Sequence, residues 1–118
     1  TFELREAVNL SSATLPHGES EFEATGLKTA PSRLVKPPRV AAAPAALECI
    51  VLSTQELFTH DGKSANHWVT FGEVVGVHIH DDFIREGRFD MTKAKSIARC
   101  GYHDYAVVEE VFEMVRPG

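Results

Sequence analysis

The sequence has 118 residues, a net charge of −5 at pH 7 and a pI near 5.6. This is the length of one domain, and 43% hydrophobic with 25% charged residues is typical of a globular chain. The acidic balance argues against a nucleic-acid partner, because phosphate binding needs a basic stripe. No apolar run approaches the roughly 20 residues of a membrane span, so no membrane partner is expected.

In chain order, the first expected elements are two short helices. Leu4, Ala7 and Val8 have the i, i+3, i+4 spacing of a helix within the first ten residues. Ser20 is predicted to cap a second short helix, and Gly26 is a natural C-terminal stop for it. The opening residues show neither the basic nor the apolar region of a signal peptide, so we expect a cytoplasmic protein.

The middle of the chain predicts an irregular segment followed by a hairpin. Residues 30–44 carry four prolines and should be extended rather than helical. Residues 45–58 read as a long strand, 59–63 as a loop with an Asp-Gly turn, and 68–79 as the returning strand. Two glycines in the second strand, Gly72 and Gly76, leave room for a bulge, a barrel bend or the close approach of another group.

The last third is expected to be short elements and a tail. Residues 81–88 form a turn-rich connection, and Thr92 is predicted to cap a short helix through Ala98, with Gly101 just beyond it. Residues 105–115 fit a helix or a strand, and we expect an extended tail. The fold class is therefore mainly β with short helices. So few long strands cannot close on themselves, so another segment or subunit must cover their edges.

The end of the second predicted strand is a candidate metal site. His78, His80 and Asp81 form a His-x-His-Asp run with both imidazoles on one strand face. A third protein ligand would have to come from elsewhere, so the favoured interpretation is a polar strand end, with no metal. The two cysteines, Cys49 and Cys100, set no disulfide framework. The sequence has no motif of a catalytic nucleophile.

Several segments carry a family resemblance by their order and spacing. They are residues 20–27 with 30–32, residues 37–40 leading through Pro44 to 46–49, and Asn66-His67 with 72–78 and 98–101. Together they resemble the latter part of the flavin reductase-like, FMN-binding split-barrel family. The departures are Ala42, where relatives often have an acidic residue, and Cys100-Gly101-Tyr102 in place of the more usual Leu-Gly-Gly.

The resemblance implies an FMN-binding split β-barrel that is incomplete here. The family's N-terminal strands, which would hold most of the flavin contacts, are missing, so residues 1–118 are expected to be the C-terminal part of one domain. It further implies FMN as cofactor, NADH or NADPH as electron donor, a homodimer, and hydride transfer from the nicotinamide to FMN. No catalytic side chain is required, because the chemistry belongs to the cofactor. The alternatives are a non-enzymatic FMN-binding electron carrier and a truncated fragment that binds no flavin.

Two pairs of residues are the candidate cofactor contacts. Asn66 and His67 begin the returning strand, where relatives place residues near the flavin, and could donate hydrogen bonds to the ring. Arg99 and Tyr102 follow the last short helix, and could pair with a phosphate and stack on the isoalloxazine. The structural alternatives are a polar hairpin shoulder for the first pair, and for the second a solvated Arg99 with a packed Tyr102.

Overall fold

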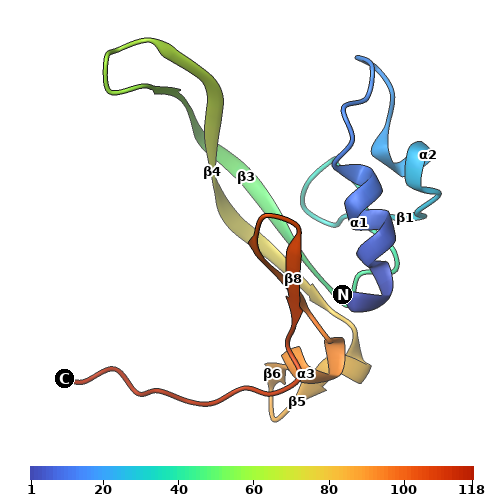
Figure 1. Ribbon diagram of the computed structural model, residues 1–118. Coiled ribbons are helices and arrows are strands. Elements are labelled where there is room, and N and C mark those ends of the chain that lie inside the picture. Colours follow the sequence, from blue (N-terminus) through green and yellow to red (C-terminus); the bar gives the residue numbers. More distant parts are fainter.

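The computed structural model describes all 118 residues and is mainly β with short helices. Its strands pair into four separate two-stranded antiparallel sheets, none of which closes into a barrel (Figure 1). Only Ala94 and Glu48 are buried. The prediction of open sheets with uncovered edges is confirmed.

The N-terminal helices form as predicted. A 3₁₀ turn, η1 (Phe2–Leu4), leads into α1 (Arg5–Ser11), and α2 (Glu21–Thr25) follows a loop. The Ser20 hydroxyl accepts a hydrogen bond from a backbone N–H in the first turn of α2. Gly26 ends this helix with a φ of 69°, a left-handed conformation that glycine adopts at little cost.

The proline-containing segment is largely irregular, as expected. Two-residue strands, β1 (Thr29–Ala30) and β2 (Arg39–Val40), pair with each other at its ends. Between them, residues 31–38 form a loop with no repetitive structure. This loop is held against the next hairpin by contacts described below.

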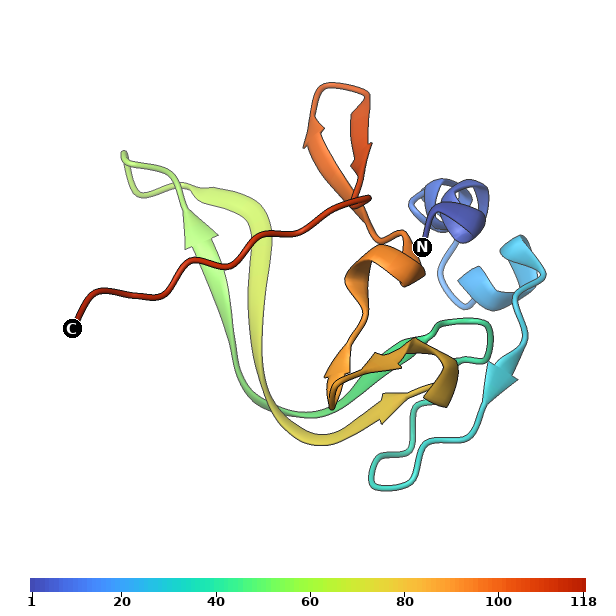
Figure 2. The ribbon, with the colours of Figure 1, turned by 90° about the horizontal axis from the view of Figure 1, so that it is seen from below.

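A long hairpin of β3 (Ala45–Phe58) and β4 (Ser64–Ile79) dominates the molecule. The predicted turn is present, with Gly62 at a φ of 81°. β4 begins four residues earlier than predicted, because Ser64 already pairs with the end of β3, and the register then shifts before His67. The hairpin bends strongly and its distal half stands away from the other elements (Figures 1 and 2).

Neighbouring side chains lie close to both glycines of β4, Gly72 and Gly76. Gly76 lies opposite Glu48, next to a shift in register. A Cβ on Gly76 would lie 3.3 Å from Leu34 Cδ1 and 3.4 Å from Glu48 Cβ. At Gly72 a Cβ would lie 3.2 Å from Cys49 Cβ. Both positions are tighter than an ordinary side-chain contact, so the absence of a side chain lets neighbouring groups pack onto the strand.

The connection after the hairpin is a group of short elements. It contains η2 (Asp81–Phe83), then the two-residue strands β5 (Ile84–Arg85) and β6 (Arg88–Phe89), then α3 (Met91–Ala94). The turn-rich character predicted for residues 81–88 is confirmed. α3 packs near η2, and Ala94 is its one buried residue.

The prediction of a helix from Thr92 through Ala98 is wrong. The cap of α3 is Asp90, whose carboxylate accepts the Lys93 N–H at 3.0 Å. The helix ends after one turn because Lys95 turns left-handed at a φ of 47°. The following residues belong to a strand instead.

That strand, β7 (Ile97–Gly101), pairs with β8 (Asp104–Val107) in a tight hairpin. Ala98 therefore lies opposite Ala106 rather than on a helix, and Gly101, with a φ of 100°, is the last residue of β7 rather than a helix stop. Residues 108–118 have no regular secondary structure. The extended tail expected over residues 105–115 is therefore confirmed from residue 108 on, whereas residues 105–107 belong to β8.

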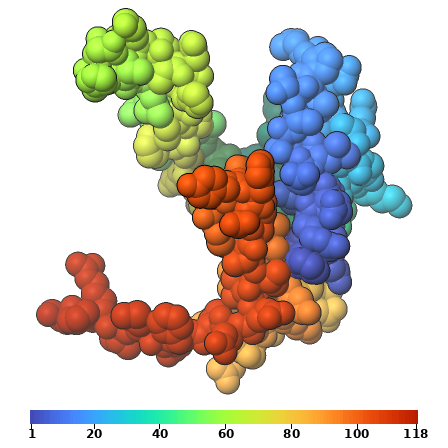
Figure 3. All heavy atoms as spheres, viewed as in Figure 1, coloured from blue at the N-terminus to red at the C-terminus, as the bar shows by residue number.

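Much apolar surface remains uncovered. The radius of gyration is 17.2 Å, whereas a compact chain of this length should have about 13.5 Å. The distal hairpin and the tail project away from the rest of the molecule (Figure 3). Their exposed side chains include Val51, Leu52, Trp68, Phe112 and Val115. Large exposed apolar side chains in such number mark places where other protein packs.

None of the helices has the length and apolar character required to cross a membrane.

Candidate functional site

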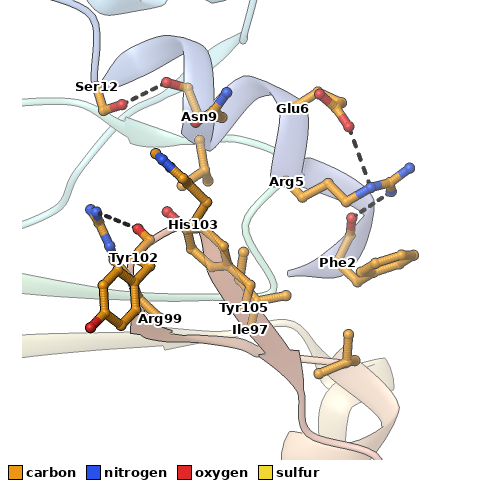
Figure 4. Close-up of a pocket in the computed structure, with 12 residues that line it drawn as sticks. Phe2, Arg5, Glu6, Asn9, Ser12, Ile97, Arg99, Tyr102, His103 and Tyr105 are labelled. Carbon is orange, nitrogen blue, oxygen red and sulfur yellow. Dashed lines mark hydrogen bonds and ion pairs between the residues drawn. The ribbon is translucent and has the colours of Figure 1, made fainter.

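The main cavity lies between α1 and the β7–β8 hairpin and has a volume of about 510 Å³ (Figure 4). This is within the range of roughly 300–1,000 Å³ for small-molecule sites. Aromatic rings and polar groups share its walls, among them Phe2, Arg5, Asn9, Arg99, Tyr102 and Tyr105.

One wall is the polar face of α1. Arg5, Asn9 and Ser12 are spaced at i, i+4 and i+7, so they follow one side of the helix and all line the cavity. The helix is fixed in place at its start, where the Phe2 N–H donates to the Lys95 carbonyl at 2.9 Å. This bond ties the beginning of the chain to the residue just before the β7–β8 hairpin.

The other wall is the hairpin itself. Arg99 lies on β7 and Tyr102 in the turn that follows it, and the Arg99 Nη2 donates to the Tyr102 carbonyl at 3.3 Å. Tyr102 has a φ of 49°, in the left-handed region that bulky residues rarely occupy, and the residue is 92% exposed. His103 and Tyr105 line the same cavity. The structure thus brings the second candidate pair together, and its contact with a flavin stays a prediction.

The first candidate pair lies elsewhere. Asn66 and His67 are exposed near the tip of the long hairpin and do not line the cavity. The Asn66 N–H donates to Ser64 Oγ at 3.0 Å, and His67 Nδ1 lies 2.5 Å from the Ala65 carbonyl. Both views of the ribbon place this tip well away from the β7–β8 hairpin (Figures 1 and 2). Within one chain, the two candidate pairs therefore do not form a single site.

Sequence reasoning missed a buried carboxylate. Glu48 is 2% exposed, and its oxygens accept hydrogen bonds from the backbone of the 31–38 loop. The distances are 2.8 Å to Arg33 N, 2.6 Å to Leu34 N and 3.1 Å to Val35 N. The His78 imidazole completes this arrangement through Nε2. The signal in the sequence was faint: a Glu and a His on facing strands, with a glycine opposite the Glu.

The His-x-His-Asp run serves local structure. His78 is bound to Glu48, and His80 Nδ1 accepts the Asp82 N–H at 3.3 Å, capping η2. No group of three or more His, Cys, Asp or Glu side chains is arranged to hold a metal ion. The polar strand end is thus the interpretation that these contacts support.

Glu48 makes the stability of the fold dependent on pH. The His78 ring, followed by the backbone N–H of Arg33, lowers the pKa of Glu48 from 4.5 to about 2. Because the pKa is lower in the folded than in the unfolded chain, the stabilisation is fully present above about pH 4.5 and is lost as the pH falls towards 2.

We therefore expect the urea concentration at the midpoint of unfolding to decrease as the pH is lowered from 4.5 to 2. In Glu48→Gln the midpoint should depend less on pH over this range. The pKa values of Asp61 and Asp90 are lowered as well, so a residual slope should remain in this variant. An unchanged profile in Glu48→Gln would show that the carboxylate is not held as described.

Solved structures share the fold. Nitrilotriacetate monooxygenase component B from Bacillus cereus superposes with a TM-score of 0.82 at 30% identity, covering 94% of this chain and 55% of that one. A protein from Shewanella frigidimarina assigned as a flavin reductase with a split-barrel domain gives 0.78 at 23% identity, covering 98% and 56%. The open β hairpins with short helices are thus part of a split-barrel fold.

The family follows from the sequence comparison. A family model described as the flavin reductase like domain matches residues 2–94, and the chain therefore belongs to the flavin reductase-like family. It is 34% identical over 112 residues to an uncharacterized protein from Halalkalibacterium halodurans, covering 95% of this chain and 53% of that protein. The chain spans about half the length of the curated relatives it matches.

Proposed function

We propose that this chain is the C-terminal part of a flavin-dependent oxidoreductase domain that binds FMN and uses NADH or NADPH as electron donor. The observation that carries the proposal is the cavity between α1 and the β7–β8 hairpin, in a chain of the flavin reductase-like family. The B. cereus relative is, by its name, a monooxygenase component. That name supports an oxidoreductase role here.

The residues present suit a flavin. Tyr102 and Tyr105 offer aromatic surface to a planar ring. Asn9 and Arg99 offer hydrogen-bond donors to carbonyl or phosphate oxygens. The cavity volume of about 510 Å³ is adequate for a ligand of this class. In this proposal the side chains bind and orient the cofactor.

When bound, FMN would supply the redox chemistry, accepting a hydride from NADH or NADPH and passing the electrons to a further acceptor. The chain's own residues would bind and orient the cofactor between α1 and the β7–β8 hairpin. No side chain of the cavity needs to act as acid, base or nucleophile. The proposed compartment is the cytoplasm, and both cysteines are free, as expected of a reducing environment.

A homodimer is part of the proposal. Beyond the Glu48–Gly76 pair the hairpin is roughly 30 Å long measured along its strands, and it carries Asn66 and His67 away from their own chain's cavity (Figures 1 and 2). Its exposed apolar side chains, such as Trp68 and Phe71, support packing against a second copy. In a dimer the hairpin tip of one protomer would approach the cavity of its partner, uniting the two candidate pairs.

The test is a titration of the purified chain with FMN, followed by absorption and flavin fluorescence, and then an assay of NADH and NADPH oxidation. Saturable binding of FMN together with oxidation of NADH or NADPH supports the oxidoreductase. Binding without nicotinamide oxidation favours the electron carrier. A chain that takes up no FMN would refute the proposal and leave the flavin-free fragment.

His67→Ala is expected to weaken FMN binding about tenfold, the effect of losing a hydrogen bond to the ring. His60→Ala is the matched control, because His60 is an exposed imidazole in the loop of the same hairpin with no hydrogen bond. The dissociation constant from fluorescence quenching measures both. Equal affinities in the two variants would remove His67 from the proposed site.

A further inference from the structure

The C-terminal tail, residues 108–118, is extended and makes few contacts with the rest of its own chain (Figure 1). It is attached at two points: the Val108 N–H donates to the Ser96 carbonyl at 2.8 Å, and Glu113 lies 3.0 Å from Arg88 in an ion pair. The side chains of that ion pair are 81% and 82% exposed, and an exposed pair holds a segment only weakly. Beyond Val108, the backbone groups of the tail form no hydrogen bonds with one another or with the rest of the chain, so they are free to pair with another segment.

Both faces of the tail are apolar. Successive side chains of an extended segment point to opposite faces, so Val111 and Val115 share one face, and Phe112 and Met114 share the other. These four residues are between 57% and 90% exposed. Side chains of this size and number mark a segment that packs against other protein, and free backbone groups are what an added strand uses to bind.

The charges of the tail indicate which surface it fits. Glu109 and Glu110 are exposed and form no ion pair. The 31–38 loop carries the opposite charge, because Arg33 and Lys36 are exposed and also form no ion pair. Complementary charges on two surfaces favour their encounter and suppress wrong partners.

The 31–38 loop also offers an apolar contact in a fixed position. Leu34 lies between the two cations in the sequence and is 64% exposed. The backbone N–H groups of residues 33–35 are bonded to the buried Glu48 carboxylate, so the loop is held in place before anything binds to it. Binding to a preformed surface costs less, because less of the chain has to be ordered.

The loop that complements the tail is the loop of a second copy. Figures 1 and 2 both place the tail and the 31–38 loop apart within one chain, and no backbone hydrogen bond or ion pair joins them. If each of two copies docks its tail on the loop of the other, the two contacts are related by a two-fold axis. Such an exchange closes the assembly as a dimer.

We propose that the tail of one copy docks on the 31–38 loop of a second copy, with its apolar side chains against Leu34 and its two unpaired carboxylates facing Arg33 and Lys36. Exposed ion pairs contribute little each, so the apolar side chains supply most of the affinity. The charges select the loop and make the dimer sensitive to salt. This contact goes beyond the homodimer proposed above, which uses the distal hairpin, and it is independent of flavin binding.

The first experiment measures the dissociation constant of the dimer of the full chain by sedimentation equilibrium. Glu109→Lys with Glu110→Lys reverses the charge of the tail, and Arg33→Glu with Lys36→Glu reverses that of the loop. Each pair of substitutions should raise the dissociation constant about tenfold at low salt, because like charges then face each other. All four substitutions together should restore most of the affinity.

The matched control is Glu19→Lys with Glu23→Lys, which changes the net charge as the tail variant does, at two exposed acidic residues outside the tail. Thermal unfolding confirms that each variant keeps its fold. The inference is overturned if the tail variant weakens the dimer no more than the control, or if the four substitutions together do not restore it. Either result leaves the dimer of the distal hairpin and the flavin proposal standing.

Cross-linking with a carbodiimide, which joins a carboxylate directly to a nearby amine, locates the contact. In a mixture of isotopically labelled and unlabelled chains, we expect Lys36 of one copy to be linked to Glu109 or Glu110 of the other. Links confined to one copy would show that the tail folds back on its own loop, and would overturn the inference. A chain that stays monomeric at every concentration would overturn both this inference and the homodimer, whereas the FMN titration tests the cofactor separately.

Discussion

Replacing Glu48 with alanine is expected to lower the midpoint of thermal unfolding by on the order of 10 °C and to release the 31–38 loop from the hairpin. The carboxylate accepts hydrogen bonds from three successive backbone N–H groups, Arg33 to Val35, and contacts the His78 ring. Alanine offers no acceptor to any of them. Leaving such donors without partners costs more than the net value of the bonds themselves.

Calorimetry and limited proteolysis measure the two consequences separately. Trypsin should cleave after Arg33 faster in Glu48→Ala, because the freed loop can enter the protease. Glu73→Ala is the matched control, since Glu73 lies on the same hairpin but is exposed and forms no ion pair. Equal midpoints and equal cleavage rates in the two variants would contradict the anchoring role of Glu48.

The sequence predicted the elements whose signals are local. The Asp-Gly turn of the long hairpin and the Ser20 and Gly26 boundaries of α2 each depend on residues within one turn. The prediction at α3 failed because Asp90 and Thr92 are both good caps, two residues apart. Pairing of 97–101 with 104–107 then decided against a longer helix. The residues that cap or stop a helix carry no information about which later residues pair with the segment as a strand.

The candidate site was predictable only in part, for a similar reason. Arg99 and Tyr102 are three residues apart, so one hairpin turn suffices to bring them together. The α1 wall, with Arg5 and Asn9, comes from the other end of the chain and has no local signal that links it to that turn. Glu48 could not be recognised as buried, because its neighbours depend on a register that bulges shift.

Gly76→Val is expected to destabilise the chain by about 1–3 kcal/mol, the usual cost of overpacking. Valine favours strands over glycine by up to about 1 kcal/mol, and on an open strand this gain would prevail. Here the new Cβ would lie 3.3 Å from Leu34 Cδ1 and 3.4 Å from Glu48 Cβ, before its methyl groups are counted. The loop must therefore move off the strand, which also strains the contacts to Glu48.

Leu34→Ala separates these effects, because Leu34 is 64% exposed and its truncation alone should cost little. In the double variant the obstructing methyl groups are gone, so Gly76→Val should recover part of its lost stability, and the two changes should be non-additive in urea denaturation. If the losses of stability in the two single variants simply add in the double variant, the valine is strained against Glu48 instead, because the Glu48 Cβ and carboxyl carbon remain in place. A Gly76→Val variant as stable as the unchanged chain would show that the loop does not pack on this strand, and the anchoring argument for Glu48 would fall with it.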